Sequence, residues 1–176
     1  FGVLDDFQRR FPTHFLNAGV AEQNMTGLAA GIALEGRIVF TYSIANFPIL
    51  RCLEQIRNDA AYHGANVKVV SIGGGFSYGA LGMSHHATED IAIMRALPAV
   101  TVVVPGDLWE TTEGTKAIAE TPGVCYLRLD KSSADVTHLR GDTFQLGKAR
   151  IVRVGARVAI ITCGGILGEV LRATRE

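Results

Sequence analysis

The sequence predicts an α/β fold in which a parallel sheet carries helices on both faces. Short runs of β-branched and apolar residues alternate with helical stretches between residues 14 and 129, and the connections are short. The run TVVV at 101–104 is apolar without alternation, which is typical of a strand buried on both faces. Together these features favour a parallel sheet over an antiparallel one.

The individual elements follow from hydrophobic periodicity and from start and stop signals. We expect strands at 14–17, 37–42, 67–72, 101–104 and 124–129. We expect helices at 20–34, at 46–64, from Thr88 onward and at 108–119. Gly36 is placed to end the first helix, Asn46 and Thr88 are N-cap candidates, and Pro48 suits a first helical turn.

The alternation stops at Asp130, and this predicts a domain boundary. We expect one domain at 1–131 and a polar, turn-rich linker at 132–146. Residues 147–176 resemble the beginning of a second α/β domain, with strands expected at 148–153 and 158–162 and a helix from Leu167. Thirty residues cannot bury a core alone, so we expect the rest of that domain to lie outside this chain.

Composition excludes several classes of protein. Of 176 residues, 48% are hydrophobic, which excludes a disordered chain, and 17 basic residues balance 17 acidic ones. No basic excess points to nucleic acid. Apolar runs such as 97–104 are much shorter than the roughly 20 residues of a membrane helix. A neutral, apolar chain is poorly protected against association, so we expect partner surfaces.

Cysteine usage favours a cytoplasmic protein. Cys52, Cys125 and Cys163 lie far apart, and none forms a CxxC pair. Their odd number and spacing argue against a disulfide framework or a zinc site. Each lies in an apolar segment, so we expect buried, reduced thiols.

Ligands of an open parallel sheet bind beyond the carboxyl ends of its strands. The loops at 18–23, 43–47, 73–86 and 105–109 are expected there. Glu22 lies in the first turn of an apolar helix, where its charge can interact favourably with the helix dipole or its carboxyl group can face the ring nitrogen of a ligand. Phe47 is either a core aromatic or a stacking surface for a flat heterocycle. Arg51, one turn later, can pair with an acidic neighbour or a phosphate.

The third loop carries His85 and His86 close to Glu89 and Asp90. The spacing His-His-x-x-Glu matches no strong metal motif, so we expect no metal site in this chain. The histidines either orient a substrate or are ordinary loop residues. Walker, GxGxxG and HExxH motifs are absent. The triplet at 73–75 opens no expected helix and is a poor phosphate cradle.

Four segments occur in an order that resembles the pyrimidine-binding domain of the transketolase family of thiamine-diphosphate enzymes. They are FPTHFLNAGVAEQNMTGLAAGIALEG, TYSIANFPILRCLEQIRND, LGMSHHATEDIAIMRALP and TVVVPGD. The first contains GVAEQ, which is similar to the signature that carries the family's catalytic glutamate. The later stretch GKARIVRVGARVAIITCGG resembles the start of the family's C-terminal domain.

The resemblance implies thiamine diphosphate as cofactor and assigns roles to residues of this sequence. Glu22 would protonate the cofactor's aminopyrimidine and so activate the ylide, Phe47 would stack on the pyrimidine ring, and His85 would act on the donor substrate. Gln23, Tyr42 and Arg51 would complete the cofactor site, and His86 would join His85 in substrate binding. The implied reaction is transfer of a two-carbon ketol unit between sugar phosphates or related ketoses and aldoses.

Three positions depart from the family pattern. Leu81 replaces the acidic residue of the family's DGPTH segment, Met83 stands where proline is usual, and Gly73 aligns near a frequent histidine. These changes leave the sugar donor open. They do not touch the glutamate that the resemblance makes catalytic.

The family holds magnesium and diphosphate with a GDG segment, which this sequence lacks. A partner chain or domain would therefore supply that half of the site, within a homodimer or heterotetramer. Alternatives are the beta subunit of a 2-oxo acid dehydrogenase decarboxylating component, a 1-deoxyxylulose-5-phosphate-synthase-like enzyme, and a non-catalytic binding module. Retention of Glu22 argues against the last.

Overall fold

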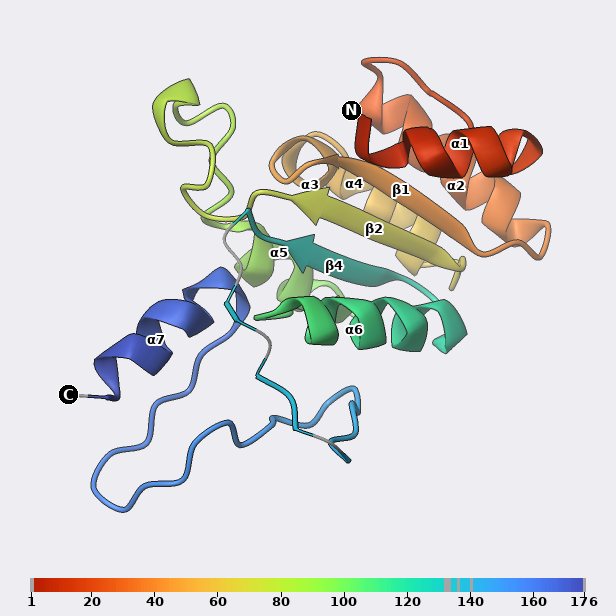
Figure 1. The fold of residues 1–176 in the computed structure, drawn as a ribbon. Helices are drawn as coiled ribbons and strands as arrows, with labels where there is room; N and C mark the ends of the chain where they lie inside the picture. Colours follow the sequence, from red (N-terminus) through yellow and green to blue (C-terminus); the bar gives the residue numbers. More distant parts are fainter. Residues whose placement is uncertain (1, 132–133, 136, 140, 176) are drawn as a thin grey trace.

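The computed structural model describes residues 2–131, 134–135, 137–139 and 141–175. Within these residues the sheet has four strands in the order β1-β2-β4-β3 (Figure 1). They are β1 (Val39–Ile44), β2 (Val67–Ile72), β3 (Thr101–Val103) and β4 (Cys125–Leu129). All neighbouring strands are parallel. The parallel α/β class predicted from the sequence is therefore confirmed.

Helices cover both faces of the sheet, as predicted (Figure 1). One face packs against α2 (Glu22–Leu34), α3 (Phe47–Leu50), α4 (Leu53–Gln55), a π-helical turn (Ile56–Ala61) and α5 (Asp90–Ala96). The other face packs against α6 (Leu108–Glu120), whose Ile118 belongs to one buried cluster with Val70, Val103 and Leu127 of the strands. The sheet is thus buried on both sides, and its ligand-accessible positions lie at its ends.

Local signals explain where the main helices begin and end. The α2 helix ends just before Gly36, whose φ of +86° is the left-handed conformation that glycine adopts without strain. The α6 helix begins after Asp107, whose carboxylate accepts a hydrogen bond from the Glu110 amide. In the part of the chain that the structure describes, no helix combines the length and apolarity that crossing a bilayer requires.

Three sequence predictions on the N-terminal side are wrong. Residues 14–17 form no strand: a 3-10 helix (Pro12–His14) follows α1 (Asp5–Arg10), and the next residues pair with no strand. The helix expected at 46–64 is divided at Arg51 and Cys52 and continues into the π-helical turn. Thr88 is not an N-cap, because α5 begins after Glu89 and the Thr88 hydroxyl instead bonds the Glu89 carboxylate.

Asn46 also departs from the expected N-cap role. It precedes α3, with Pro48 in the first turn as predicted, but makes no capping hydrogen bond. Its Nδ2 donates instead to the carbonyl of Ser84, at 2.8 Å. This bond ties the loop after β1 to the loop after β2.

The two strands expected at 148–153 and 158–162 are not formed. These residues lie in extended or irregular backbone, and Ile151, Val158 and Ile161 expose three quarters or more of their surface. A strand needs a neighbour for its hydrogen bonds, and neither segment has one among the described residues. A 3-10 turn (Gly164–Ile166) and α7 (Leu167–Ala173) follow, so the helix expected from Leu167 is confirmed.

The same irregular segment explains an error about the cysteines. All three thiols are free and Cys52 and Cys125 are buried, as predicted, but Cys163 is exposed. The linker expected at 132–146 falls partly outside the described residues. Its described part contacts α6: Phe144 packs near Ile118, and Thr137 bonds Asp107. The proposed domain boundaries stay a prediction.

Candidate active site at the carboxyl end of the sheet

Glu22 lies in the first turn of α2, and its side chain is only 12% exposed. Its Oε2 accepts a hydrogen bond from Nη1 of Arg51 at 3.1 Å. Arg51 directly follows α3, which is the first helix after β1. The Glu22–Arg51 pair therefore joins the helix before β1 to the segment after β1. The structure thus brings the predicted catalytic carboxylate to the predicted edge of the sheet.

Phe47 opens α3 on the same edge and lies beneath the same arginine. The guanidinium carbon of Arg51 is 4.0 Å from the centroid of the Phe47 ring, within cation–π range. Arg51 is therefore in contact with both side chains that the sequence assigned to the aminopyrimidine. Because the Arg51 side chain is 48% exposed, it is free to move away at modest cost.

His85 joins this cluster from the loop after β2. Its ring lies 5.1 Å from that of Phe47 and 5.9 Å from that of Tyr78. Nδ1 of His85 is 3.0 Å from the Ser84 hydroxyl, which fixes one edge of the imidazole. A carboxylate, a cation, an aromatic ring and an imidazole thus meet from three separate segments of the chain.

Three other predicted site residues lie outside this cluster. His86 turns back into its own loop, where Nε2 is 2.8 Å from the carbonyl of Gly79 and the ring packs on Phe76. Gln23 is exposed on α2. Tyr42 packs on the α6 side of the sheet, and burial, reinforced by Tyr78, raises the pKa of its phenol.

Sequence reasoning missed a buried polar group beneath the histidine loop. Asp90, 3% exposed, accepts hydrogen bonds on Oδ2 from the Tyr126 hydroxyl at 2.5 Å and from Nε of Arg128 at 2.8 Å. Burial, followed by the Asp90 charge, raises the pKa of Tyr126 well above its ordinary value, so the phenol stays a donor. No local pattern signals this contact, because Asp90 lies far from Tyr126 and Arg128 along the chain.

The chemistry of the cluster suits the aminopyrimidine half of thiamine diphosphate. A mostly buried carboxylate suits a ring nitrogen, and an adjacent aromatic face suits a flat heterocycle. The glycine triplet is a poor place for the diphosphate: a Cβ at Gly74 would lie 2.1 Å from the Arg128 guanidinium carbon, so that side chain already fills the space. The described residues also contain no cluster of His, Cys, Asp and Glu suited to a metal ion.

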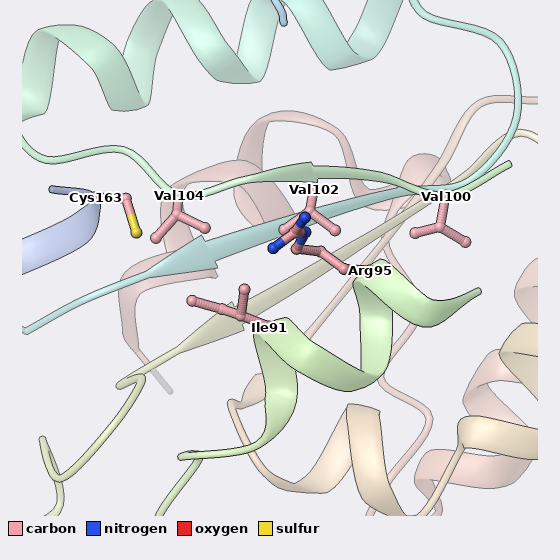
Figure 2. Close-up of a pocket in the computed structure, with 6 residues that line it drawn as sticks. All are labelled: Ile91, Arg95, Val100, Val102, Val104 and Cys163. Atoms are coloured by element: carbon pink, nitrogen blue, oxygen red, sulfur yellow. The ribbon is translucent and has the colours of Figure 1, made fainter. Parts of the chain in front are cut away.

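A separate cavity lies away from this cluster. It has a volume of about 500 Å³ and is lined by Ile91 and Arg95 of α5, by valines in β3 and next to both of its ends, and by the exposed Cys163 (Figure 2). In Figure 2 its walls are Ile91 and the three valines 100, 102 and 104. None of the predicted site residues lines it, so it adds nothing to the cluster around Glu22.

Comparison with known proteins fits this geometry. Residues 1–136 match the family model of the transketolase pyrimidine-binding domain. A Methanocaldococcus jannaschii protein described as a transketolase C-terminal section is 43% identical over 169 residues, which cover 95% of this chain and 54% of that protein. One of the subunits of the apulose-4-phosphate transketolase of Phocaeicola vulgatus is 37% identical, over 92% of this chain and 52% of its own length.

A solved structure, described as a split-gene transketolase in an inactive beta4 tetramer, superimposes with a TM-score of 0.85. It is 36% identical, and the match covers 97% of this chain and 55% of that one. This chain spans about half the length of the relatives it matches. On these matches, the chain belongs to the transketolase family and carries its pyrimidine-binding domain.

Proposed function

We propose that this chain is one half of a thiamine-diphosphate-dependent, transketolase-like enzyme that transfers a two-carbon ketol unit between sugar phosphates or related ketoses and aldoses. The observation that carries the proposal is the meeting of Glu22, Phe47 and His85 at the carboxyl end of the sheet. Bound thiamine diphosphate supplies the nucleophilic thiazolium carbon that the protein itself lacks.

Each residue of the cluster has a separate task in this proposal. Glu22 exchanges a proton with the ring nitrogen of the aminopyrimidine, from a side chain that water barely reaches. Phe47 provides the stacking face. Arg51 contacts both groups, so it has to give up at least one of these contacts when a pyrimidine ring enters between them. His85, held by Ser84, donates to or accepts from the donor sugar.

A partner chain or domain completes the site. It holds magnesium and the diphosphate, in a homodimer or heterotetramer assembled in the cytoplasm. Two observations support a partner: the described residues offer no metal-binding cluster, and the relatives include proteins described as a transketolase C-terminal section and as a transketolase subunit. The glycine triplet cannot substitute, because Arg128 fills the space above Gly74.

The names of the relatives favour ketol transfer over the 2-oxo acid alternative. The relatives include transketolase subunits named for apulose 4-phosphate and for 6-deoxy-6-sulfo-D-fructose, from Phocaeicola vulgatus and a Clostridium species. Both names refer to ketoses or compounds derived from them. We therefore infer that the donor substrate is a ketose or a compound derived from one.

The experiment uses the enzyme reconstituted from this chain and a chain that carries the diphosphate-binding domain. Glu22→Gln should slow hydrogen–deuterium exchange at the thiazolium carbon by about 10²–10⁴-fold, the usual contribution of a positioned acid–base group. Glu54→Gln, an exposed glutamate on α4, is the matched control. Circular dichroism should show the same fold in both variants. An exchange rate unchanged in Glu22→Gln would overturn the assignment.

A further inference from the structure

The buried group Asp90–Tyr126–Arg128 lies under the loop that carries His85 and has no role in the cofactor contacts described above. The Arg128 side chain is 11% exposed and pairs with the Asp90 carboxylate, which is 3% exposed. Tyr126, fully buried, accepts a hydrogen bond from Ser71 of β2 at 2.8 Å and donates its own to Asp90. The carboxylate is thereby anchored to two central strands of the sheet.

Besides pairing with Asp90, Arg128 contacts both stems of the loop that carries His85, that is, the residues that enter the loop after β2 and those that leave it toward α5. Its Nη2 donates to the carbonyl of Ala87 at 3.3 Å, on the stem that leads into α5. Its guanidinium also lies against the backbone of Gly74, on the stem that leaves β2, closely enough to exclude any side chain there. The same guanidinium therefore touches the chain on both sides of the loop.

The two stems also bond each other where Arg128 meets them. The Gly75 amide donates to the Ala87 carbonyl at 2.7 Å, and the Ala87 amide donates back to Gly75 at 3.0 Å. Residues 76–86 thus form a loop that is closed by the Gly75–Ala87 pair, and we call this pair the neck. His85 lies near the Ala87 end of the loop. His85 meets Phe47 close to this neck, in the part of the loop where Asn46 also bonds the Ser84 carbonyl.

We propose that Asp90 is a positioning residue: through Arg128 it fixes the neck of the loop 76–86 and so holds His85 against Phe47 in the donor-binding position. This rests on the proposed function for the role of His85, but not for the role of Asp90 in the neck. A buried ion pair is weak support for stability, since desolvation offsets most of its attraction. The pair instead fixes the position of Arg128, because both Arg128 donors and the Tyr126 donor have fixed directions.

The main test compares Asp90→Asn with Asp59→Asn, an exposed aspartate of the π-helical turn. Amide hydrogen exchange is measured on the whole chain. In Asp90→Asn, amides of residues 76–86 should exchange at least tenfold faster, while those of β2 keep their rates. A uniform acceleration across the sheet would mean that Asp90 only stabilises the fold, and unchanged rates in the loop would mean that it positions nothing.

A kinetic test on the reconstituted enzyme separates donor binding from cofactor activation. With D-fructose 6-phosphate as the probe donor, Asp90→Asn should raise the donor KM about tenfold or more. Exchange at the thiazolium carbon, which depends on Glu22, should stay within twofold of wild type. Equal losses in both measurements would overturn the proposal. If wild type itself shows no thiazolium exchange, the proposed function fails, while the amide measurement still decides the role of Asp90.

Two further variants guard against a misfolded Asp90→Asn protein. Tyr126→Phe removes one donor to Asp90 and leaves Arg128 in place, so loop exchange should rise by a smaller factor. Gly74→Ala leaves Asp90 intact but displaces the guanidinium from the neck. It should reproduce the loop effect of Asp90→Asn. If Gly74→Ala leaves the loop amides unchanged, the neck is not held through Arg128 and the proposal is wrong.

Discussion

The two ends of the sheet use their polar side chains differently. At the amino end, Lys68 of β2 is fully buried, and its Nζ donates to the carbonyls of Thr121 and Gly123 at 2.6 and 2.7 Å. At the carboxyl end, the side chains of the Glu22–Arg51 pair remain 12% and 48% exposed. At the amino end the charge of Lys68 is enclosed, whereas at the carboxyl end the Glu22–Arg51 pair keeps its charges within reach of a ligand.

The enclosed end serves the fold. Lys68 binds carbonyls just beyond the end of α6, where the helix leaves acceptors without partners and where positive charge is favoured. Burial lowers the pKa of this lysine, and the nearby Cys125 thiol opposes that shift. The Glu22 cluster has the opposite character, because its groups come from three separate segments and contact one another through side chains. The comparison separates groups that hold the structure from groups that are available for chemistry.

The largest expected effect tests whether the carboxyl end of the sheet is half of a site. This chain alone should bind thiamine diphosphate with a Kd of roughly millimolar at best, because one stacked ring and one charge-assisted bond contribute about 2–4 kcal/mol. Adding a chain with the diphosphate-binding domain should tighten binding about a thousandfold, or about 4 kcal/mol. Calorimetric titration with magnesium measures both constants. A low-micromolar Kd for the chain alone would show a complete site here.

The next effect tests the enclosed end. Lys68→Met keeps much of the side-chain volume but leaves two buried carbonyls without their donor, so the free energy of unfolding should fall by about 3 kcal/mol. Chemical denaturation measures the loss, and Lys148→Met, at an exposed lysine, is the control. Thiazolium exchange in the reconstituted, folded enzyme should be unchanged. A stable Lys68→Met protein with impaired exchange would contradict the division between the two ends.

Phe47→Ala should have a smaller effect, on affinity more than on stability. Loss of one stacked ring costs about 0.5–1.5 kcal/mol beyond its area, so cofactor affinity in the assembled enzyme should fall up to roughly tenfold. Phe7→Ala, on α1 and 46% exposed, is the control. If the melting temperature of Phe47→Ala falls sharply and its cofactor affinity does not change, Phe47 is a core aromatic and not a stacking surface.

How far the sequence predicts this fold depends on whether a segment finds its neighbours. Val67–Ile72 (VKVVSI) and 158–162 (VAIIT) have similar composition, and both are predicted as strands. The first lies between β1 and β4 and is a strand. The second has no partner among the described residues and stays irregular. Hydrophobic pattern reports a tendency to be buried, whereas pairing depends on distant residues.

The candidate site shows the same limit at the level of single side chains. Placement of Phe47 at the carboxyl end follows from the expected strand before it, which a sequence reveals. Glu22 lies there because α2 precedes β1, and not because of the strand expected at 14–17, which is not formed. The opposite directions of His85 and His86 do not follow from the order of the elements, because adjacent loop residues carry no periodic signal. Nor does the convergence of Asp90 and Arg128, which the parallel crossover brings together. Contacts between loops depend on the topology of the whole fold, and local sequence patterns do not predict them.

The smallest expected effect concerns a group that lies at the carboxyl end but is as enclosed as Lys68. Burial alone would raise the pKa of Asp107, but hydrogen bonds from the Glu110 amide and from Thr137, together with the charge of Arg150, lower it. Because the pKa is lower in the folded than in the unfolded chain, the carboxylate stabilises the fold above about pH 4. That contribution is lost as the pH falls through the folded pKa.

Asp107→Asn should therefore lower the free energy of unfolding by about 1 kcal/mol at neutral pH, and its difference from wild type should shrink below about pH 4. Denaturation at a series of pH values checks this, with Asp59→Asn as the exposed control. A difference that stays constant into the acid range would mean that the Asp107 charge is not what holds the start of α6. At this end of the sheet, burial of a charged group would then not imply that its charge stabilises the fold.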